Sequence, residues 1–168
     1  MCSWQTPKNM NGPVYIEESV ISFLSARQSR DVVLAARQEL TRRWWRARRS
    51  YDLFVSQLVL DEAGAGDPKA RARRLRILRG IPVLALTDRA RELADELVRL
   101  GVLPKKATVD AFHVAIAADH QIDYLLTWNC RHIANATMRG TIDAICRSEG
   151  LDPSVICTPE ELPIGSSR

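Results

Sequence analysis

The sequence predicts an α/β fold, a three-layer α/β/α sandwich with a parallel sheet of four or five strands. Short apolar segments typical of strands alternate along the chain with amphipathic segments typical of helices. The strand segments are apolar throughout rather than alternating in polarity, which indicates a parallel sheet covered on both faces. With 168 residues and 46% hydrophobic content, the chain has enough material for one domain with a substantial core.

The first part of the predicted domain contains two strands separated by two helices. Residues 14–16 form a short β-branched and aromatic strand, and a helix starts near Val20 after Glu17, Glu18 and Ser19. Ordinary helix-start chemistry, with Ser19 as a cap, is one explanation for this polar junction. Ser29 or Asp31 opens a long helix that ends near Arg49. Its predicted core-facing residues are Val32, Val33, Ala36, Leu40 and Trp44. The second strand is expected at residues 53–56.

Three helices and a third strand are predicted in the middle of the chain. The strand covers residues 83–86, and the helices cover residues 57–63, 69–79 and 89–100. Glycines end the first of these helices, Asp67-Pro68 starts the second, and Thr87-Asp88 caps the third. The residues expected to pack beneath the second helix are Ala70, Leu75, Ile77 and Leu78.

Residues 106–135 combine a packed helix, a buried strand and a polar strand end. The helix stops near His120, and its expected packing residues are Val109, Phe112, Ile116 and the alanines at 115, 117 and 118. Asp110 interrupts this apolar pattern. The strand at 123–127 runs directly into Trp128-Asn129, so polar groups follow the strand where ligands bind in open parallel sheets. A helix at 133–148 and a strand at 155–157 complete the domain.

Basic residues are concentrated in two blocks, although the formal net charge is only +4. One block lies between Arg37 and Arg49 and surrounds Trp44 and Trp45, and the other lies between Lys69 and Arg79. Arginine matches phosphate oxygens, so both blocks are candidates for phosphate contact. Solvated helix faces, or docking sites for an acidic partner, explain the blocks equally well. For the tryptophans we favour packing over base stacking, with Trp44 in the core and Trp45 more exposed.

The expected domain covers residues 13–162, between a flexible extension at 1–12 and a tail at 163–168. No apolar run has the roughly 18 residues that a membrane span needs, and the first residues lack the apolar centre of a secretory signal. We therefore expect a cytoplasmic protein without membrane contact. The four cysteines show neither CxxC pairing nor zinc-site spacing, so we expect reduced thiols.

Four polar residues are candidates for one site: Glu17, Glu62, Asp110 and Asn129. Right-handed crossovers put all strand ends on one edge, which brings Glu17 and Asn129 together if the first and fourth strands are neighbours. Three carboxylates in one cleft would repel each other without a cation. Their oxygens suit Mg²⁺ or Mn²⁺, which would relieve that repulsion, orient a phosphodiester and lower the pKa of an attacking water.

The order of these residues resembles the PIN domain family, and especially the VapC-type toxins of type II toxin–antitoxin pairs. The resemblance covers about residues 14–162 and rests on four motifs, VYIEESVISFL, FVSQLVLDEA, VDAFHVAIAADHQIDYLLTWN and TPEEL. It implies a parallel sheet between helices and metal-dependent endonucleolytic cleavage of RNA. It also implies neutralisation by a cognate antitoxin protein and a homodimer.

Carried over by position, the resemblance makes Glu17, Glu62 and Asp110 the metal ligands and Asn129 the residue that positions the attacking water. The family usually has Asp where this chain has Glu17, and many members have Asp where it has Asn129. Glu17 keeps the charge on a longer arm, whereas Asn129 keeps an oxygen and loses the charge, which weakens a second metal position.

The remaining polar residues near these positions receive secondary roles. Thr127 and Ser19 are predicted to contact substrate, and Arg131 and His132 are predicted to contact its backbone or to cap the next helix. His113 lies three residues after Asp110, and we expect a packed, hydrogen-bonded side chain rather than a general base.

Two other functions compete with the ribonuclease. One is a PIN-like RNA-binding or partner-binding module with weakened catalysis, which Glu17 and Asn129 favour. The other is a phosphotransfer or nucleotide-binding protein, which is weaker because the chain has no Walker lysine loop and no GxGxxG motif.

Overall fold

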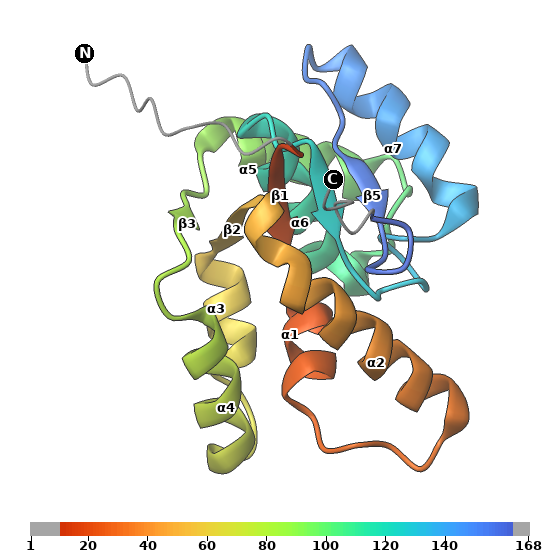
Figure 1. Cartoon of the computed structure of the whole chain (residues 1–168). Helices are drawn as coiled ribbons and strands as arrows, with labels where there is room; N and C mark the ends of the chain where they lie inside the picture. The colour runs from red at the N-terminus through yellow and green to blue at the C-terminus, as the bar shows by residue number, and fades with distance from the viewer. Residues whose placement is uncertain (1–10, 163–168) are drawn as a thin grey trace.

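A computed structural model describes residues 11–162 of the chain (Figure 1). Its five strands form one parallel sheet in the order β3-β2-β1-β4-β5. The predicted α/β sandwich with a parallel sheet is therefore confirmed. The tail predicted at 163–168 and residues 1–10 of the predicted N-terminal extension lie outside the described residues, and the domain limits 13 and 162 stay a prediction.

The strands and helices alternate as predicted. The strands are β1 (Pro13–Ile16), β2 (Asp52–Ser56), β3 (Val83–Leu84), β4 (Tyr124–Leu126) and β5 (Val155–Cys157). The α-helices are α1 (Glu18–Ser25), α2 (Val32–Ala47), α3 (Gln57–Ala63), α4 (Pro68–Leu78), α5 (Asp88–Arg99), α6 (Thr108–Asp119) and α7 (Ala136–Ser148). Short 3-10 helices cover Arg48–Ser50 and Lys105–Ala107.

Three helices start at capping residues that the sequence predicts. The side chains of Asp31, Asp67 and Thr87 accept hydrogen bonds from the backbone N–H three residues later, at 2.9, 2.8 and 3.0 Å. The first helix differs, because Glu17 rather than Ser19 occupies the cap position and accepts from the backbone N–H of Ser19 at 3.2 Å. The alternative interpretation, with Ser19 as the cap of α1, is therefore wrong.

Among the elements that are shorter than predicted are β3, β4 (Tyr124–Leu126 rather than 123–127) and α7. The third strand covers only Val83–Leu84, at the edge of the sheet, and the carbonyl of Ala85 instead lies 2.8 Å from Nε2 of His120 at the end of α6. Helix α7 begins at Ala136 rather than at residue 133. Backbone turns occupy the intervening segment, in which the N–H of Ala134 donates to the carbonyl of Asn129 at 2.9 Å.

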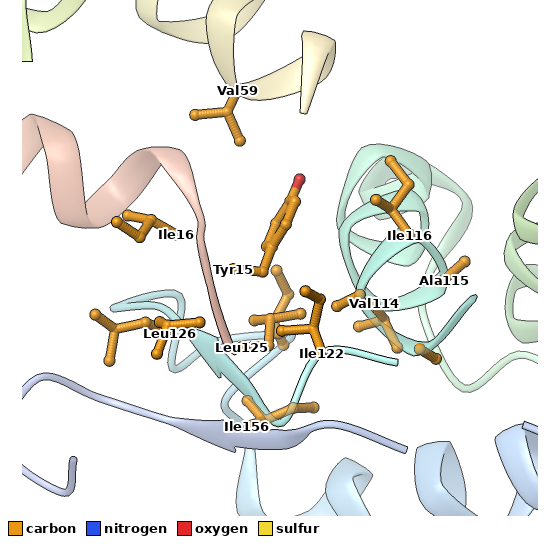
Figure 2. Close-up of a cluster of buried hydrophobic side chains, with 14 of the residues drawn as sticks. Tyr15, Ile16, Val59, Val114, Ala115, Ile116, Ile122, Leu125, Leu126 and Ile156 are labelled. Atoms are coloured by element: carbon orange, nitrogen blue, oxygen red, sulfur yellow. The ribbon is translucent and has the colours of Figure 1, made fainter. Parts of the chain in front are cut away.

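The core lies on both faces of the sheet. In Figure 1, α2 lies in front of the central strands, and α5 and α6, which pack on each other, lie behind them. Trp44 is fully buried and Trp45 is half-buried, as predicted, with ring centroids 6.4 Å apart. Behind the sheet, Figure 2 shows Tyr15 among Val59, Val114 and Ile116, with its hydroxyl pointing between α3 and α6.

Several residues predicted to pack in the core are exposed. Val32 and Val33 are 82% and 61% exposed, and Ala36 is also exposed. The buried residues of α2 are Gln38, Thr41 and Trp44, so only the second half of this helix packs against the rest of the domain. Leu75 of α4 and Val109 of α6 are exposed as well.

The described cysteines are free thiols, as predicted. Cys146 and Cys157 are buried, and burial raises their pKa values to about 11 and about 12, whereas Cys130 is exposed. Cys2 lies outside the described residues. Within residues 11–162, no helix is both long and apolar enough to span a membrane.

Candidate metal-binding site

The carboxyl ends of β1 and β4 form the centre of the site. These strands are neighbours, and their register pairs Ile16 with Leu126, so Glu17 and Thr127 follow side by side. The strand order reverses here, because β2 and β3 lie on one side of β1 and β4 and β5 on the other. Such a reversal opens the crevice in which parallel sheets bind ligands.

Glu17 is held by two hydroxyl groups on this sheet edge. Its side chain is almost fully buried, at 5% exposure. Thr127 Oγ1 donates to Glu17 Oε2 at 2.6 Å, and the hydroxyl of Ser19 donates to the same oxygen. These two hydroxyls in turn accept from the backbone N–H groups of Asn129 and Trp128, at 2.9 and 2.8 Å. The carboxylate is thereby fixed at the end of β1.

Glu62 approaches from α3 and meets His113 of α6. Nε2 of His113 lies 3.0 Å from Glu62 Oε2, and the imidazole is fully buried while the carboxylate side chain is 38% exposed. Nδ1 of His113 lies 2.7 Å from the Tyr15 hydroxyl, which lies 2.6 Å from the Ser56 hydroxyl. The prediction of a packed, hydrogen-bonded His113 is confirmed.

Ser56, Tyr15, His113 and Glu62 form a row of hydrogen bonds in which every group can donate in the same direction. If the Ser56 hydroxyl donates to Tyr15 and the Tyr15 hydroxyl donates to Nδ1, then Nε2–H donates to the carboxylate. Burial lowers the pKa of His113, but the hydrogen bond to Glu62 and the charges of Glu17, Glu62 and Asp110 outweigh it and raise that pKa on balance. Burial raises the pKa of Tyr15, so its phenol keeps the proton that it donates to Nδ1 of His113.

The carboxylates of Glu17 and Glu62 fit a divalent cation. One ligand atom from each of Glu17, Glu62 and His113 lies within 4.8 Å of the other two. Two carboxylates at this spacing supply the oxygen ligands that Mg²⁺ and Mn²⁺ prefer. The partly exposed side chain of Glu62 leaves a route from solvent to this group.

Asp110 lies in the first turn of α6 and forms a second cluster with Asn129 and His132. Asn129 Nδ2 donates to Asp110 Oδ1 at 3.0 Å, and His132 Nδ1 lies 2.8 Å from Asp110 Oδ2. The Asn129 side-chain oxygen accepts from the backbone N–H of His132 at 3.2 Å. Both oxygens of Asp110 are thus engaged, and Asn129 orients this carboxylate through its amide nitrogen.

The four predicted positions therefore form two adjacent clusters. Glu17 and Glu62 meet at His113, and Asp110 lies one helical turn from His113 on α6. Ser19 and Thr127, predicted to contact substrate, direct their hydroxyls at Glu17. Arg131 is exposed, and its carbonyl accepts from Asn135 Nδ2 at 3.2 Å.

Sequence reasoning missed Tyr15 and Ser56, and for His132 it predicted a substrate-backbone contact or a cap rather than the contact with Asp110. Tyr15 reads as an ordinary core aromatic, and only the position of His113 opposite β1 gives its hydroxyl a partner. His132 precedes α7 by only a few residues, which suggested a cap. The proximity of Asn129 and His132 to Asp110 depends on how β4 and α6 pack.

Glu18, next to Glu17, belongs to a structural contact. Its Oε1 accepts from the Ser22 hydroxyl at 2.6 Å and lies 3.6 Å from Arg74 Nε of α4. Burial, followed by the charge of Glu17, raises the pKa of Glu18, although Ser22 and Arg74 act against this. The side chain joins α1 to α4.

Comparison with known proteins gives one family. The chain matches the PIN domain over residues 32–137, a range that includes Glu62, Asp110 and Asn129 and begins after Glu17. No curated protein matches the chain. PIN domains are typically nucleases that use divalent metal ions, which agrees with the carboxylates at this sheet edge. Since the match covers more than half of the sequence, the chain belongs to the PIN domain family.

Proposed function

We propose that the chain is a metal-dependent endoribonuclease that hydrolyses RNA phosphodiester bonds. The observation that carries this proposal is the meeting of Glu17 and Glu62, which come from different elements, within ligand distance at the carboxyl edge of the sheet. In this proposal Glu17, Glu62 and Asp110 hold Mg²⁺ or Mn²⁺, directly or through water. The bound ion neutralises the carboxylates, orients a phosphodiester and acidifies the attacking water.

The other polar residues of the candidate site also have defined parts in this proposal. The hydroxyls of Ser19 and Thr127 hold the Glu17 carboxylate in place at the site. Asn129 holds Asp110 through its amide nitrogen. It also leaves uncharged the position at which many family members have Asp. The exposed Arg131 next to Asn129 is the proposed contact to substrate phosphate, and substrate contacts of Ser19 and Thr127 stay predictions.

Cleavage of a labelled single-stranded RNA by the purified protein tests this proposal. We expect cleavage with Mg²⁺ or Mn²⁺, none in excess EDTA, and none by the Asp110→Asn and Glu62→Gln variants. Asp95→Asn is the matched control, because Asp95 is exposed on α5 and has no contact within the described residues. Cleavage by Asp110→Asn at the wild-type rate would overturn the assignment.

A PIN-like RNA-binding or partner-binding module is the alternative function. The full occupation of the Asp110 oxygens by Asn129 and His132 favours it, because a ligand in this position must compete with two hydrogen bonds. Calorimetric titration with Mn²⁺ decides between the two functions. Binding that disappears in Glu62→Ala supports the nuclease, and the absence of binding that depends on Glu62 supports the module.

We also propose that this nuclease is the cytoplasmic toxin of a toxin–antitoxin pair. The support is the resemblance of the motifs around Glu17, Glu62 and Asp110 to VapC-type toxins. Induced expression in a bacterial host should stop growth, and coexpression of a small protein encoded beside the gene should restore it. Growth arrest by Asp110→Asn equal to that by the wild type would contradict a toxic nuclease.

A homodimer is the proposed assembly, and α2 supplies a candidate surface. Val32, Val33 and Leu34 expose apolar side chains, and the two valines line a pocket of about 660 Å³ that also includes Trp128 and Arg139. Light scattering should give twice the chain mass of 18.9 kDa for the wild type and the single mass for Val32→Ser/Val33→Ser. Val155→Ser, at an exposed position of β5, is the control and should stay dimeric.

A further inference from the structure

Helix α4 carries a cationic face that has no internal partner. The cationic face consists of Lys69, Arg71, Arg76 and Arg79, the last at the C-cap. All four side chains are exposed, and none forms an ion pair or a side-chain hydrogen bond within residues 11–162. No acidic residue occurs between Asp67 and Asp88, so local charges leave this face uncompensated.

The arginines of α2 are arranged differently. Arg46 and Arg42 lie 3.2 and 4.0 Å from the carboxylate of Glu39. The guanidinium of Arg37 lies 5.3 Å from the ring centroid of Trp128, and that of Arg48 lies 4.3 Å from the ring centroid of Trp45. Much of the charge on α2 is thus engaged within the chain, whereas the charge of the cationic face is available to a ligand.

The inward side of α4 fixes the helix beside the metal site. Arg74 Nε donates to the carbonyl of Ala63 at 2.9 Å, directly after Glu62, and also pairs with Glu18, directly after Glu17. Arg73 Nε donates to the carbonyl of Ser25 at the end of α1 at 3.3 Å. These contacts hold α4 against α1 and α3, as Figure 1 shows, and leave the outward side free.

Like charges along one helix repel each other, and the pairs Arg73/Arg76 and Arg76/Arg79 have the three-residue spacing at which side chains are neighbours. A polyanion relieves this repulsion and releases its own counterions on binding. At 1.5 Å per residue, the helix is about 16 Å long, roughly the length of five stacked nucleotides at 3.4 Å each. The face thus matches a nucleic-acid strand in charge and in length.

We propose that the cationic face of α4 binds the phosphate backbone of the RNA to one side of the cleaved bond. This inference rests on the proposed function, because it takes RNA as the ligand and the carboxylates as the place of cleavage. Arginine side chains contact two phosphate oxygens at once, so the face binds the backbone without reading its sequence. The contact is made before and during cleavage, so it increases affinity and leaves the chemical step unchanged.

The test measures RNA affinity without cleavage. A fluorescein-labelled single-stranded RNA of about 20 nucleotides is titrated in EDTA over a series of salt concentrations, with anisotropy as the readout. Each lost phosphate contact should reduce the slope of log K against log salt by about 0.7, so Arg71→Gln/Arg76→Gln should reduce it by about 1.4. Arg43→Gln/Arg49→Gln is the matched control, with the same change in net charge at two exposed arginines without partners.

An equal reduction of the slope of log K against log salt in both double variants would overturn the proposal. RNA affinity would then depend on net charge alone and not on the position of the arginines. Unchanged RNA binding by Arg71→Gln/Arg76→Gln would also overturn it. Both variants should keep the wild-type melting temperature, since all four substituted side chains are exposed and glutamine favours helices.

Kinetics separate this proposal from the proposed function. With Mg²⁺ or Mn²⁺, Arg71→Gln/Arg76→Gln should raise KM and leave kcat unchanged, because it removes binding that ground state and transition state share. If the wild type binds RNA through α4 but does not cleave it, the proposed function fails and the binding face stands. If cleavage depends on metal but the α4 substitutions leave KM and the salt slope unchanged, only the binding face fails.

Discussion

His113 Nε2 lies 3.0 Å from Glu62 Oε2, and this contact joins the proposed metal ligand on α3 to the buried side of α6. Groups that orient ligands in this way typically change metal affinity by about 10–100-fold when they are removed. We expect His113→Asn to weaken Mn²⁺ binding by this amount, because asparagine reaches the Tyr15 hydroxyl but not Glu62.

His113→Gln is the matched variant for that measurement. The glutamine amide reaches the place of Nε2 and keeps the contact with Glu62, so its Mn²⁺ affinity should stay closer to the wild-type value. Calorimetric titration gives both affinities, and thermal unfolding reports the loss of packing separately. Equal affinities for the two variants would show that the contact does not orient Glu62.

Asn129→Asp introduces the residue that many members of the family have at this position. The substitution replaces a donor to Asp110 by a second negative charge, so without metal it should destabilise the fold, by roughly 1–3 kcal/mol. The added carboxylate should also strengthen Mn²⁺ binding or add a second bound ion. Chemical denaturation in EDTA measures the expected loss of stability. Calorimetric titration measures the expected gain in Mn²⁺ affinity or stoichiometry.

Asn129→Ala separates charge from hydrogen bonding at the same position. It removes the donor to Asp110 without adding charge, so it should destabilise the fold without any gain in Mn²⁺ binding. A gain in affinity with alanine would contradict the role of the new carboxylate in Asn129→Asp.

Thr127→Val removes one hydroxyl with almost no change in side-chain shape. Thr127 is fully buried, donates to Glu17 and accepts from the backbone N–H of Asn129, so valine leaves a buried donor unsatisfied. The free energy of unfolding should fall by roughly 1–3 kcal/mol, with a parallel loss of RNA cleavage. Thr127→Ser keeps the hydroxyl and should retain most of the activity, and a serine variant as inactive as valine would argue against this network.

Glu161 gives a stability that depends on pH. Burial acts to raise its pKa, but the hydrogen bonds from Thr158 and the charge of Arg139 outweigh burial and lower that pKa. A lowered pKa contributes stability above the ordinary pKa of Glu, about 4.3, and this contribution is lost as the pH falls through the folded-state value.

We therefore expect Glu161→Gln to melt below the wild type at pH 7, and the difference to shrink as the pH falls below about 4. The neighbouring Glu160 forms no hydrogen bond or ion pair within residues 11–162, so Glu160→Gln should melt like the wild type at both pH values. A difference that persists unchanged at low pH would show that ionisation of Glu161 does not stabilise the turn after β5.

The sequence predicts the order of strands and helices well, because apolar runs and capping residues are local signals. Asp31, Asp67 and Thr87 start helices where their side chains accept backbone hydrogen bonds. Burial is harder to predict for α2, because Val32 and Val33 have core-facing spacing but lie in the half of the helix that extends beyond the domain.

The site shows the same division between local and tertiary information. Glu17 and Asn129 are predictable, since each follows a strand that ends at the same edge. Residue type and spacing do not show that Asp110 would be engaged by Asn129 and His132, or that Tyr15 would bond His113. Those contacts depend on the packing of α6 against the sheet.

Glu17 both starts α1 and supplies a carboxylate to the proposed metal site. Ion uptake and folding are therefore thermodynamically linked through one side chain. An ion present at 100 times its Kd stabilises the folded state by about 2.7 kcal/mol, provided it does not bind the unfolded chain. The melting temperature of this domain should consequently rise with the concentration of free divalent ion, even when no RNA is present.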